Sequence, residues 1–440
     1  MSVLPSPSTA NGSESGISLE LPHFTDLRLA GPSIISSLFR RIVFTRLQSI
    51  HGGSLVIRDA GGVAEFGDTN ADLQVTINVH DAKFYRAVAT GGSMGAGESY
   101  IDGGWSCSNL TELIQLFSRN LESSSRLGGI VENVLTLARR VSHRLNRNSK
   151  TGSRRNIAAH YDLSNDFYEL FLDETMTYSS GVFNDESATM RDASVEKYDR
   201  LCRKLDLSEQ DHLLEIGTGW GGFSIHAAKN YGCRITTTTI SAEQHRYAKE
   251  RIQSEGLDGQ IELLSKDYRD LNGVYDKLVS IEMIEAVGHQ YLPTYFQQCS
   301  NLLKPNGLFA FQAITIPDQR YDSYRRSVDF IQKYVFPGGF LPSVGALSLA
   351  VGKYTDMHWI HYEDFAEHYA TTLKNWREKL FENVAAVREL GMSDSFLRLW
   401  EFYLCYCEGG FREKQIGVAQ VVLEKPENRR PASYPGLGCK

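Results

Sequence analysis

The sequence predicts an α/β protein in which a doubly wound, mostly parallel sheet with a helical insertion follows a smaller α+β domain. Short apolar segments alternate with helix-length segments from about residue 195 onward, which is typical of parallel strands joined by helices. A glycine-rich loop follows the first of these segments. The 440 residues also exceed one typical domain of about 100 to 200 residues, so more than one compact unit is expected.

The composition is that of an ordinary globular protein and favours some partners over others. Hydrophobic residues make up 42% of the chain, charged residues 22%, and the formal net charge is -7, so nucleic acid is not an expected partner. The 7 cysteines are odd in number and scattered, which favours a reducing compartment and predicts a cytoplasmic protein. No apolar run approaches the roughly 18 residues of a membrane span.

The N-terminal part is expected to contain a tail and a small domain. Residues 1–19 are rich in Ser, Pro and Gly and lack a signal-peptide pattern, so they are predicted to be disordered. Within residues 20–125, "SLVIRD", "GVAEFG" and "DLQVTINVHD" alternate apolar and polar side chains, which predicts half-buried antiparallel strands. "DAKFYRAVATGG" and "NLTELIQLFSRN" are predicted helices, the second with Asn109 and Thr111 as candidate caps.

Residues 126–156 are predicted to form a basic helix and a linker. Apolar residues recur at helical spacing, and no Asp or Glu occurs between residues 133 and 161. The basic residues are Arg139, Arg140, Arg144, Arg147, Lys150, Arg154 and Arg155. Two interpretations stay open: a solvated helix face, or a surface that contacts anionic phospholipid headgroups at the membrane.

Residues 157–427 carry the predicted catalytic domain, and residues 428–440 a tail. The expected strands are "HLLEIG", "RITTTTI", "IELLSKD", "KLVSIEM", "LFAFQAI" and, after a long helical stretch, "GVAQVVLEKP". Residues 317–345 interrupt this alternation with an aromatic-rich segment. We expect this insertion to be a lid or the wall of an acyl pocket.

The glycine loop "LLEIGTGWGG" indicates a nucleotide-like cofactor at the end of the first strand. Gly217, Gly219 and Gly222 satisfy the dinucleotide fingerprint, which also expects an acid about 20 residues later. The chain has "TTTTIS" there instead. Glu215 directly precedes the glycines, as in the E/D-x-G-x-G pattern of class I S-adenosylmethionine methyltransferases, and "KDYRDL" at the third strand supports that interpretation over a nucleotide-redox one.

Two acids and a histidine stand out in "LVSIEMIEAVGHQY", residues 278–291. Glu282, Glu285 and His289 follow a segment that otherwise resembles a buried strand. Burying an unpaired charge is costly, so these acids are expected to meet specific partners. The end of a parallel strand is also where such a sheet usually places its chemistry.

These motifs together resemble a known family. "AAHYDLSNDFYELFLDETMTYSSGVF", "LLEIGTGWGG", "SIEMIEAVGH", "FPGGFLPS", "YATTLKNW" and "YCEGGFR" occur in the order found in cyclopropane-fatty-acyl-phospholipid synthases and the related mycolic acid cyclopropane synthases. The resemblance is strong over residues 155–425 and is greatest to the plant-type branch. It implies a seven-stranded class I methyltransferase sheet. The first domain resembles the N-terminal domain of longer members on less distinctive motifs, which implies a domain that presents lipid or dimerises.

The resemblance implies a reaction and a substrate. S-adenosylmethionine would give a methyl group to the double bond of an unsaturated phospholipid acyl chain, and loss of a proton would close a cyclopropane ring. Rival outcomes are a methyl-branched or methylene fatty acid, N-methylation of a small amine, and a catalytically silent lipid- or adenosine-binding module. The resemblance also implies peripheral contact with an anionic membrane. It implies a homodimer as well, as in longer members.

The resemblance also assigns the cofactor-binding residues by position. Tyr178 and Ser179 would bind the methionine portion, and the Gln244 amide would meet the ribose in place of the missing acid. Asp267 and Tyr268 would contact adenine. The remaining residues of this implied set are Leu213, Leu214, Glu215, Ile216, Gly217, Thr218, Gly219, Trp220, Gly221, Thr239 and Ile240.

The base in this family is thought to be a bicarbonate ion. Its implied holders here are Glu285, Tyr369, the backbone at Ile314, Ser180 and Gln312. Many bacterial members have Cys and His at the last two positions, but a hydroxyl and an amide can also hydrogen-bond to an anion. A shared proton or a carboxyl pKa raised by burial would let Glu285 lie beside that anion.

Other candidate residues are expected to have lesser roles. Glu282 is interpreted as a structural acid that supports the site, and His289 as a cap or surface residue. His160 falls in the segment that folds over the active site in the family. Cys407 matches a cysteine discussed there as catalytic, although a thiol in an apolar helix is ordinarily protonated and inert, which favours a pocket-lining role. Cys405 lies two residues away, and no metal site is expected.

Overall fold

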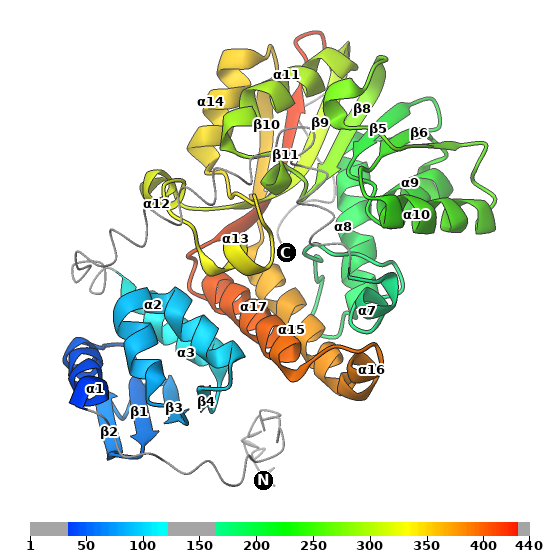
Figure 1. Cartoon of the computed structure of the whole chain (residues 1–440). Helices are drawn as coiled ribbons and strands as arrows, with labels where there is room; N and C mark the ends of the chain where they lie inside the picture. The colour runs from blue at the N-terminus through cyan, green and yellow to red at the C-terminus, as the bar shows by residue number, and fades with distance from the viewer. Residues whose placement is uncertain (1–33, 122–162, 430–440) are drawn as a thin grey trace, which may run out of the picture.

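The computed structural model describes residues 34–121 and 163–429, which form two domains packed together (Figure 1). The predictions for the tail at 1–19, the basic helix at 126–156 and His160 lie outside the described residues. So does nearly all of the tail at 428–440. Within the described ranges, no helix is both long and apolar enough to cross a membrane.

The N-terminal domain packs three helices and a four-stranded sheet of order β2-β1-β3-β4. Its elements are α1 (Ile34–Leu47), β1 (Ser54–Asp59), β2 (Gly62–Gly67), β3 (Gln74–Val79), α2 (Lys83–Ile101), β4 (Trp105–Cys107) and α3 (Leu110–Arg119). The prediction of antiparallel strands is correct for β1–β2 but wrong for β1–β3, which pair in parallel. The chain reverses twice between β1 and β3, and β3 then pairs with β1 and not with β2, so the two run in the same direction.

Helices α2 and α3 form where the sequence predicts them. The Asn109 side chain caps α3 by accepting a hydrogen bond from the Glu112 backbone N–H. Thr111 does not cap the helix, because its hydroxyl donates to Glu408 in the other domain. Helix α2 is longer than expected and kinks at Gly92, whose φ of 56° and ψ of -136° fit a glycine.

The second domain contains the predicted sheet. Its strands are β5 (His212–Ile216), β6 (Arg234–Thr238), β7 (Ile261–Leu264), β8 (Tyr275–Ile281), β9 (Leu303–Thr315), β10 (His358–Asp364) and β11 (Gly417–Glu424). They are ordered β10-β11-β9-β8-β5-β6-β7 and are parallel from β9 to β7, whereas β11 is antiparallel to both of its neighbours. The predicted seven-stranded, mostly parallel sheet is therefore confirmed.

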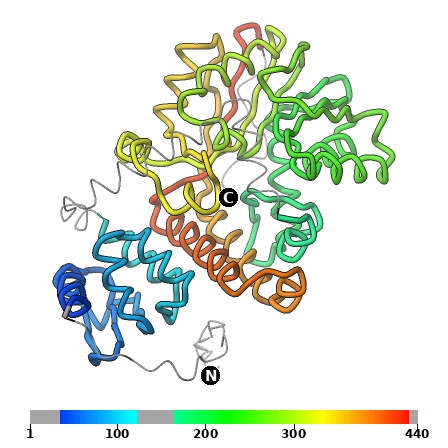
Figure 2. The backbone as a smooth tube through the Cα atoms, viewed as in Figure 1, coloured from blue at the N-terminus to red at the C-terminus, as the bar shows by residue number. Residues whose placement is uncertain are grey.

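Helices cover the sheet and build one end of the domain (Figure 1). The α-helices are α7 (Asn165–Glu169), α8 (Met190–Leu205), α9 (Gly222–Tyr231), α10 (Ala242–Ser254), α11 (Leu292–Leu302), α12 (Asp318–Tyr324), α13 (Phe330–Tyr334), α14 (Val344–Tyr354), α15 (Ala366–Glu382), α16 (Val384–Glu389) and α17 (Asp394–Arg412). Short 3-10 helices are η1 (Tyr268–Asp270), η2 (Ile284–Ala286) and η3 (His289–Tyr291). The insertion predicted at 317–345 contains α12 and α13, which lie between the sheet and the N-terminal domain (Figure 2).

The two domains meet along α17. Tyr100 donates a hydrogen bond to Glu401 at 2.6 Å, and Thr111 donates to Glu408 at 2.9 Å. Gly97 of α2 approaches α13 and α17 so closely that a Cβ there would lie 2.9 Å from the Phe330 ring. The N-terminal domain is thereby fixed against the helices that enclose the site.

Candidate active site

The order of the strands places a cleft at the carboxyl end of β5. Strand β5 pairs with β6 on one side and β8 on the other, so the chain changes direction across the sheet at this point. Loops at such a switch point diverge and leave a crevice for a ligand. A cavity of about 1140 Å³ opens here, and its lining includes residues from both domains.

The glycine loop after β5 forms the cofactor end of this cavity. Gly217, Gly219 and Gly221 have φ values of 106°, 53° and 90°, a region in which side chains are strained. Buried Glu215, near the end of β5, anchors the start of the loop. It accepts hydrogen bonds from Ser224 and, at 2.6 Å, from Thr237. Burial raises the pKa of Glu215 to about 7, while the hydrogen bonds from Ser224 and Thr237 oppose this rise.

Most of the residues that the resemblance assigns to the cofactor line the cavity. They are Tyr178, Ser179, Glu215, Ile216, Gly217, Thr218, Gly219, Trp220, Thr239, Ile240, Gln244, Asp267 and Tyr268. Leu213, Leu214 and Gly221 do not line it, and the side chains of both leucines lie in the core on either side of β5. The individual contacts to S-adenosylmethionine stay predictions.

Two of these side chains are already held in place. The Gln244 side-chain oxygen accepts a hydrogen bond from the Thr239 hydroxyl at 3.0 Å, which leaves its amide N–H groups to face a ligand. Asp267 accepts two hydrogen bonds of 2.7 Å from the Arg269 guanidinium. Fixed polar groups of this kind lose little freedom when a ligand binds.

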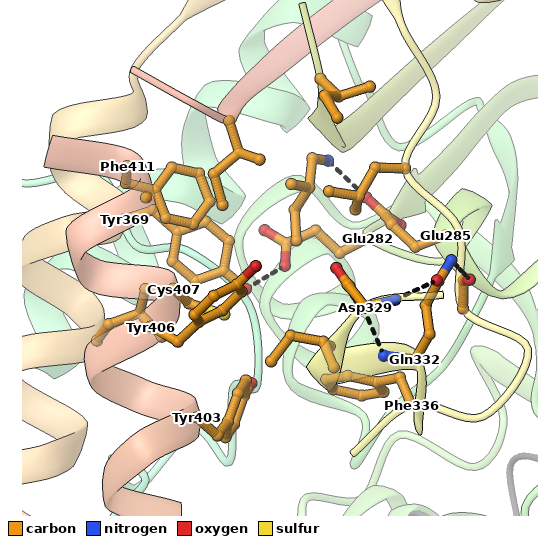
Figure 3. Close-up of a pocket in the computed structure, with 18 of the residues that line it drawn as sticks. Glu282, Glu285, Asp329, Gln332, Phe336, Tyr369, Tyr403, Tyr406, Cys407 and Phe411 are labelled. Carbon is orange, nitrogen blue, oxygen red and sulfur yellow. Dashed lines mark hydrogen bonds between the residues drawn. The ribbon is translucent and has the colours of Figure 1, made fainter. Parts of the chain in front are cut away.

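The cavity wall also holds a polar cluster centred on Glu282 (Figure 3). The Tyr369 hydroxyl donates to one carboxylate oxygen of Glu282 at 2.7 Å. The Gln312 amide, at 2.8 Å, and the Ser180 backbone N–H, at 3.0 Å, donate to the other. The Ser180 hydroxyl points elsewhere and donates to the carbonyl of Gly181.

Further polar residues fix the direction of the Gln312 amide. Its side-chain oxygen accepts from the Gln420 amide at 3.1 Å, and the Gln420 oxygen accepts from the Lys204 ammonium at 2.7 Å. Because a lysine can only donate, this chain of bonds runs in one direction. It therefore turns the amide nitrogen of Gln312 toward Glu282.

Lys197 is a site residue that the sequence reasoning missed. It is fully buried on α8, its ammonium donates to the Ser179 hydroxyl at 2.6 Å, and its charge favours the ionised form of Glu282. Burial lowers the pKa of Lys197 to about 8. One signal was available, because Lys197 stands four residues from Ala193 and from Leu201, a spacing that places all three on one side of a helix, where a buried charge needs a partner.

Glu285 lies beside this cluster but has different partners. One carboxyl oxygen accepts from the Ile314 backbone N–H, and the other is buried with no hydrogen-bond partner among the described residues. Burial and the neighbouring Glu282 raise the pKa of Glu285 to about 8. The structure thus brings together every residue expected around a bicarbonate ion, but Tyr369, Gln312 and Ser180 contact Glu282 and not a site beside Glu285.

Replacing Glu285 by Gln should change how stability depends on pH. The native pKa of about 8 lies above the usual 4.5, so the folded protein holds a proton that the unfolded chain loses between these values. The free energy of unfolding of the wild type should fall from about pH 4.5 to 8, whereas Glu285→Gln avoids this loss and should be more stable at pH 8 by about 4 kcal/mol. Urea unfolding at pH 5 and pH 8 measures it, with exposed Glu262→Gln as control. Parallel pH curves for the wild type and Glu285→Gln would contradict it.

Aromatic side chains and one thiol complete the wall near the carboxylates. Tyr403, Tyr406, Cys407 and Phe411 of α17 line the cavity, and Phe336 from the insertion faces them (Figure 3). Burial raises the pKa of the Cys407 thiol well above its usual value, so it stays protonated and supports the lining role. Aromatic faces of this kind stabilise a nearby cation and exclude water.

The other candidates lie away from the carboxylates or outside the described residues. His289 is exposed and contacts Tyr321 and Arg325 through its two ring nitrogens, at 2.9 and 3.2 Å, so it is a surface residue and not a cap. Cys405 is buried in the core and does not line the cavity. Within the two described ranges, no group of three or more His, Cys, Asp or Glu residues is arranged to hold a metal ion.

Comparison with known proteins assigns this fold and site to a family. Residues 148–421 match the family described as mycolic acid cyclopropane synthetase. The chain belongs to this family. Its sheet is that of class I methyltransferases, so the protein is an S-adenosylmethionine-dependent methyltransferase.

Individual members of the family are similar over most of the chain. The tuberculostearic acid methyltransferase of Mycobacterium tuberculosis is 39% identical over 349 residues, 77% of this chain and 80% of that protein. The cyclopropane-fatty-acyl-phospholipid synthase of Escherichia coli is 36% identical over 371 residues, 83% of this chain and 90% of that protein. Both alignments are longer than the stretch from residue 148 to the C-terminus, so they extend into the N-terminal domain.

Solved structures of the family resemble the second domain. The cyclopropane synthase MmaA2 from Mycobacterium tuberculosis is 29% identical with a TM-score of 0.58, covering 62% of this chain and 98% of that one. Mycolic acid cyclopropane synthase CmaA1, complexed with SAH and CTAB, is 28% identical with the same TM-score of 0.58, also covering 62% of this chain and 98% of that one. Coclaurine N-methyltransferase, at 18% identity and a TM-score of 0.57, shares the fold and covers 75% of this chain and 98% of that one.

Proposed function

We propose that the protein transfers the methyl group of S-adenosylmethionine to the double bond of an unsaturated phospholipid acyl chain and forms a cyclopropane fatty acid. The observation that carries this proposal is the lining and the size of the cavity. Its lining joins the glycine loop and Glu282 to a set of apolar side chains from both domains, which we call the corridor. Its volume of about 1140 Å³ exceeds the roughly 300 to 1,000 Å³ of most ligand pockets, which leaves room for a cofactor and a long hydrocarbon.

The corridor continues beyond the methyltransferase domain. Its lining includes Leu55, Ile57, Phe84 and Leu113, which are buried inside the N-terminal domain. A hydrocarbon chain gains about 0.8 kcal/mol for each CH₂ group that it buries, so such a wall favours an acyl chain strongly. A small amine would use none of it, which argues against N-methylation as the activity.

Small residues of α2 keep this end of the corridor open. Gly92, Ser93 and Ala96 line it, and the kink at Gly92 changes the direction of the helix there. A Cβ on Gly92 would meet no atom within 4 Å, which indicates free space beside the backbone. We therefore infer that the N-terminal domain holds part of the acyl chain, and this assigns a lipid-binding role to the domain.

The chain's own residues meet the demands of the chemistry. When bound, S-adenosylmethionine supplies an electrophilic methyl carbon for the double bond to attack. The buried walls exclude water from the acyl cation that results, and the faces of Tyr403, Tyr406 and Phe336 lower its energy. A carboxylate in the wall can then accept a proton, and the electrons of the broken C–H bond close the ring.

Other fates of the cation give the rival products. A 1,2-hydride shift would move the cation to the methyl-bearing carbon, and loss of a proton from that methyl group would then give a methylene group. Reduction of this alkene by a separate hydride donor, such as a nicotinamide cofactor, would give a methyl branch. The relative that is 39% identical is named a tuberculostearic acid methyltransferase, which favours keeping the methyl-branched product as the second candidate.

Lipid analysis of cells that express the protein tests the function. Cells fed methionine with a labelled methyl group should contain acyl chains heavier by one labelled methylene, and NMR should detect cyclopropane ring protons. Labelled chains without ring signals would support the branched or methylene product instead. Labelled small amines with unmodified lipids would overturn the acyl-chain assignment, and no labelled product would support a silent binding module.

Filling the corridor with a larger side chain should change which acyl-chain lengths the enzyme prefers as substrates. Val88 lines it within the N-terminal domain, and a tryptophan there would occupy space that we assign to the acyl chain. We expect Val88→Trp to lower kcat/KM for long unsaturated chains about tenfold and to affect short chains less, since burial of one or two CH₂ groups is worth this much. Val63, which is 63% exposed on β2, gives the matched control Val63→Trp. Equal losses for all chain lengths would contradict the corridor.

A phospholipid substrate also requires the enzyme to meet a bilayer. The basic residues predicted to do so lie outside the described residues, and they are Arg139, Arg140, Arg144 and Arg147. Changing all four to Gln should weaken sedimentation with anionic vesicles, most clearly at low salt, because salt screens such attraction. Neutral vesicles are the control. Unchanged binding to anionic vesicles would favour a solvated helix face.

A further inference from the structure

We infer that Glu282 is the general base of this enzyme, and that its carboxylate takes the place that the family resemblance gives to bicarbonate. The inference deepens the proposed function and rests on it for the reaction, but the geometry stands on its own. A bicarbonate ion does not fit the donors present, because Tyr369, Gln312 and the Ser180 N–H already bind the carboxylate of Glu282. The protein thus supplies a carboxylate covalently where a free anion is expected.

The position of Glu282 suits a base. The residue follows β8 directly, at the carboxyl edge of the parallel sheet, and it lines the cavity. Tyr403, Tyr406 and Cys407 line the same part of the cavity (Figure 3). Ser180 and Gln312 are buried and do not line the cavity, so they act on the reaction only through Glu282.

The backbone at Glu282 supports a role for its side chain. Its φ is 46°, in the left-handed region where a non-glycine residue costs about 1 to 2 kcal/mol. Glycine would adopt this conformation without strain. Strained residues of this kind are typical of functional sites, where surrounding contacts hold them in place. Here the contacts to Tyr369 and Gln312 hold the side chain, and the Glu282 backbone N–H donates to the Gln312 carbonyl at 2.8 Å.

The surrounding charges decide which of the two neighbouring acids is ionised. Burial raises the pKa of Glu282, but the charge of Lys197 and three hydrogen-bond donors oppose this rise and favour its charged form. Glu285 has only the Ile314 N–H among these described contacts, and repulsion from Glu282 favours its neutral form. The pair therefore holds one proton, on Glu285, and leaves Glu282 free to accept another.

The proton transfer balances with the reaction proposed above. The methyl carbon delivered to the acyl chain loses a proton to a carboxylate oxygen of Glu282. The two electrons of that C–H bond form the second C–C bond to the cationic carbon and close the ring. Glu282 becomes a neutral carboxylic acid, still within reach of Tyr369, and returns its proton to solvent after the product leaves.

Conservative variants of the two acids test the assignment. Glu282→Gln keeps the shape but removes the base, so kcat should fall by at least about a hundredfold, as for loss of a general base. Its affinity for S-adenosylhomocysteine, measured by calorimetry, should stay within about threefold. Glu262→Gln on β7 is the matched control. Loss of turnover in Glu285→Gln together with normal turnover in Glu282→Gln would overturn the assignment.

Removing the whole side chain tests whether it replaces bicarbonate. Glu282→Gly leaves the donors of Tyr369 and Gln312 facing an empty space and also relieves the backbone strain. Added bicarbonate should restore its turnover at least about tenfold, since these donors give an anion strong hydrogen bonds. The turnover of the wild type should not change when bicarbonate is added, and it should be the same in buffer from which carbon dioxide has been removed. Wild-type turnover that depends on bicarbonate would overturn the inference.

Binding of ¹³C-labelled bicarbonate separates this inference from the proposed function. NMR line broadening should show that Glu282→Gly binds the ion and that the wild type does not, whether or not any lipid product forms. Binding by the wild type would refute the replacement of bicarbonate by Glu282. Absence of lipid product from the wild type, with this binding pattern intact, would instead refute only the acyl-chain reaction.

Discussion

Lys197→Met should lower turnover at pH 7 by about a hundredfold, the size of effect seen when a fixed electrostatic contact is removed from an active site. Lys197 does not line the cavity, so the variant removes no group that touches substrate. It removes the positive charge that favours the ionised form of Glu282. The pKa of Glu282, already raised by burial, should then rise further, and less of the base is ionised at neutral pH.

The pH profile distinguishes this role from simple loss of structure. Because the variant needs a higher pH to ionise Glu282, its turnover should recover as pH rises from 7 to 9. Wild-type turnover should decline in that range, since the pKa of Lys197 is about 8 and its charge is lost there. Exposed Lys229 on α9 provides the control Lys229→Met. Parallel profiles for Lys197→Met and the wild type would refute the electrostatic role.

Glu408→Ala should lower the free energy of unfolding by about 3 kcal/mol, because it breaks a buried charge cluster by removing one partner. Glu408 is 2% exposed and joins three elements. Thr111 of α3 donates to it at 2.9 Å, Arg377 of α15 at 3.1 Å, and Arg412 at the end of α17 at 3.0 Å. The variant leaves the guanidinium of Arg377 half-buried without this acceptor.

Denaturant unfolding followed at both domains measures this loss. Since Glu408 joins the N-terminal domain to α17, we expect the two domains to unfold at separate midpoints in the variant. Glu389 on α16 is exposed, and Glu389→Ala should change stability by less than about 0.5 kcal/mol, as surface substitutions usually do. A Glu408→Ala variant as stable as this control would show that the cluster adds little.

The sequence predicted the central sheet because most of its strands are short apolar segments separated by helix-length segments. It did not reveal β10, whose sequence "HWIHYED" mixes aromatic and charged residues. This strand lies at the edge of the sheet and, among the described strands, pairs only with β11, so most of its side chains are partly exposed and carry no clear pattern. The parallel pairing of β1 with β3 was also not predictable, because alternation fixes the faces of a strand and not its neighbours.

The site was predictable as a set of residues but not as a set of contacts. The resemblance gathered Tyr369, Gln312, Ser180 and Glu285, and the structure brings them together. The role of Glu282 depends on a backbone conformation and on a tyrosine 87 residues away, neither of which a local pattern encodes. Lys197 was hidden for the same reason, since its effect on Glu282 arises only when α8 packs beneath the sheet.

Helix α17 lines the cavity with some of its side chains and contacts the N-terminal domain with others. Tyr403 and Cys407 face the reaction chamber, whereas Glu401 and Glu408 hold the N-terminal domain. Because one rigid helix forms part of the cavity wall and part of the domain interface, a displacement of the N-terminal domain would also move the wall around the reacting carbons. Substitutions along α17 will therefore alter lipid selection and resistance to unfolding together, and variation among relatives at this helix should be interpreted with both effects in mind.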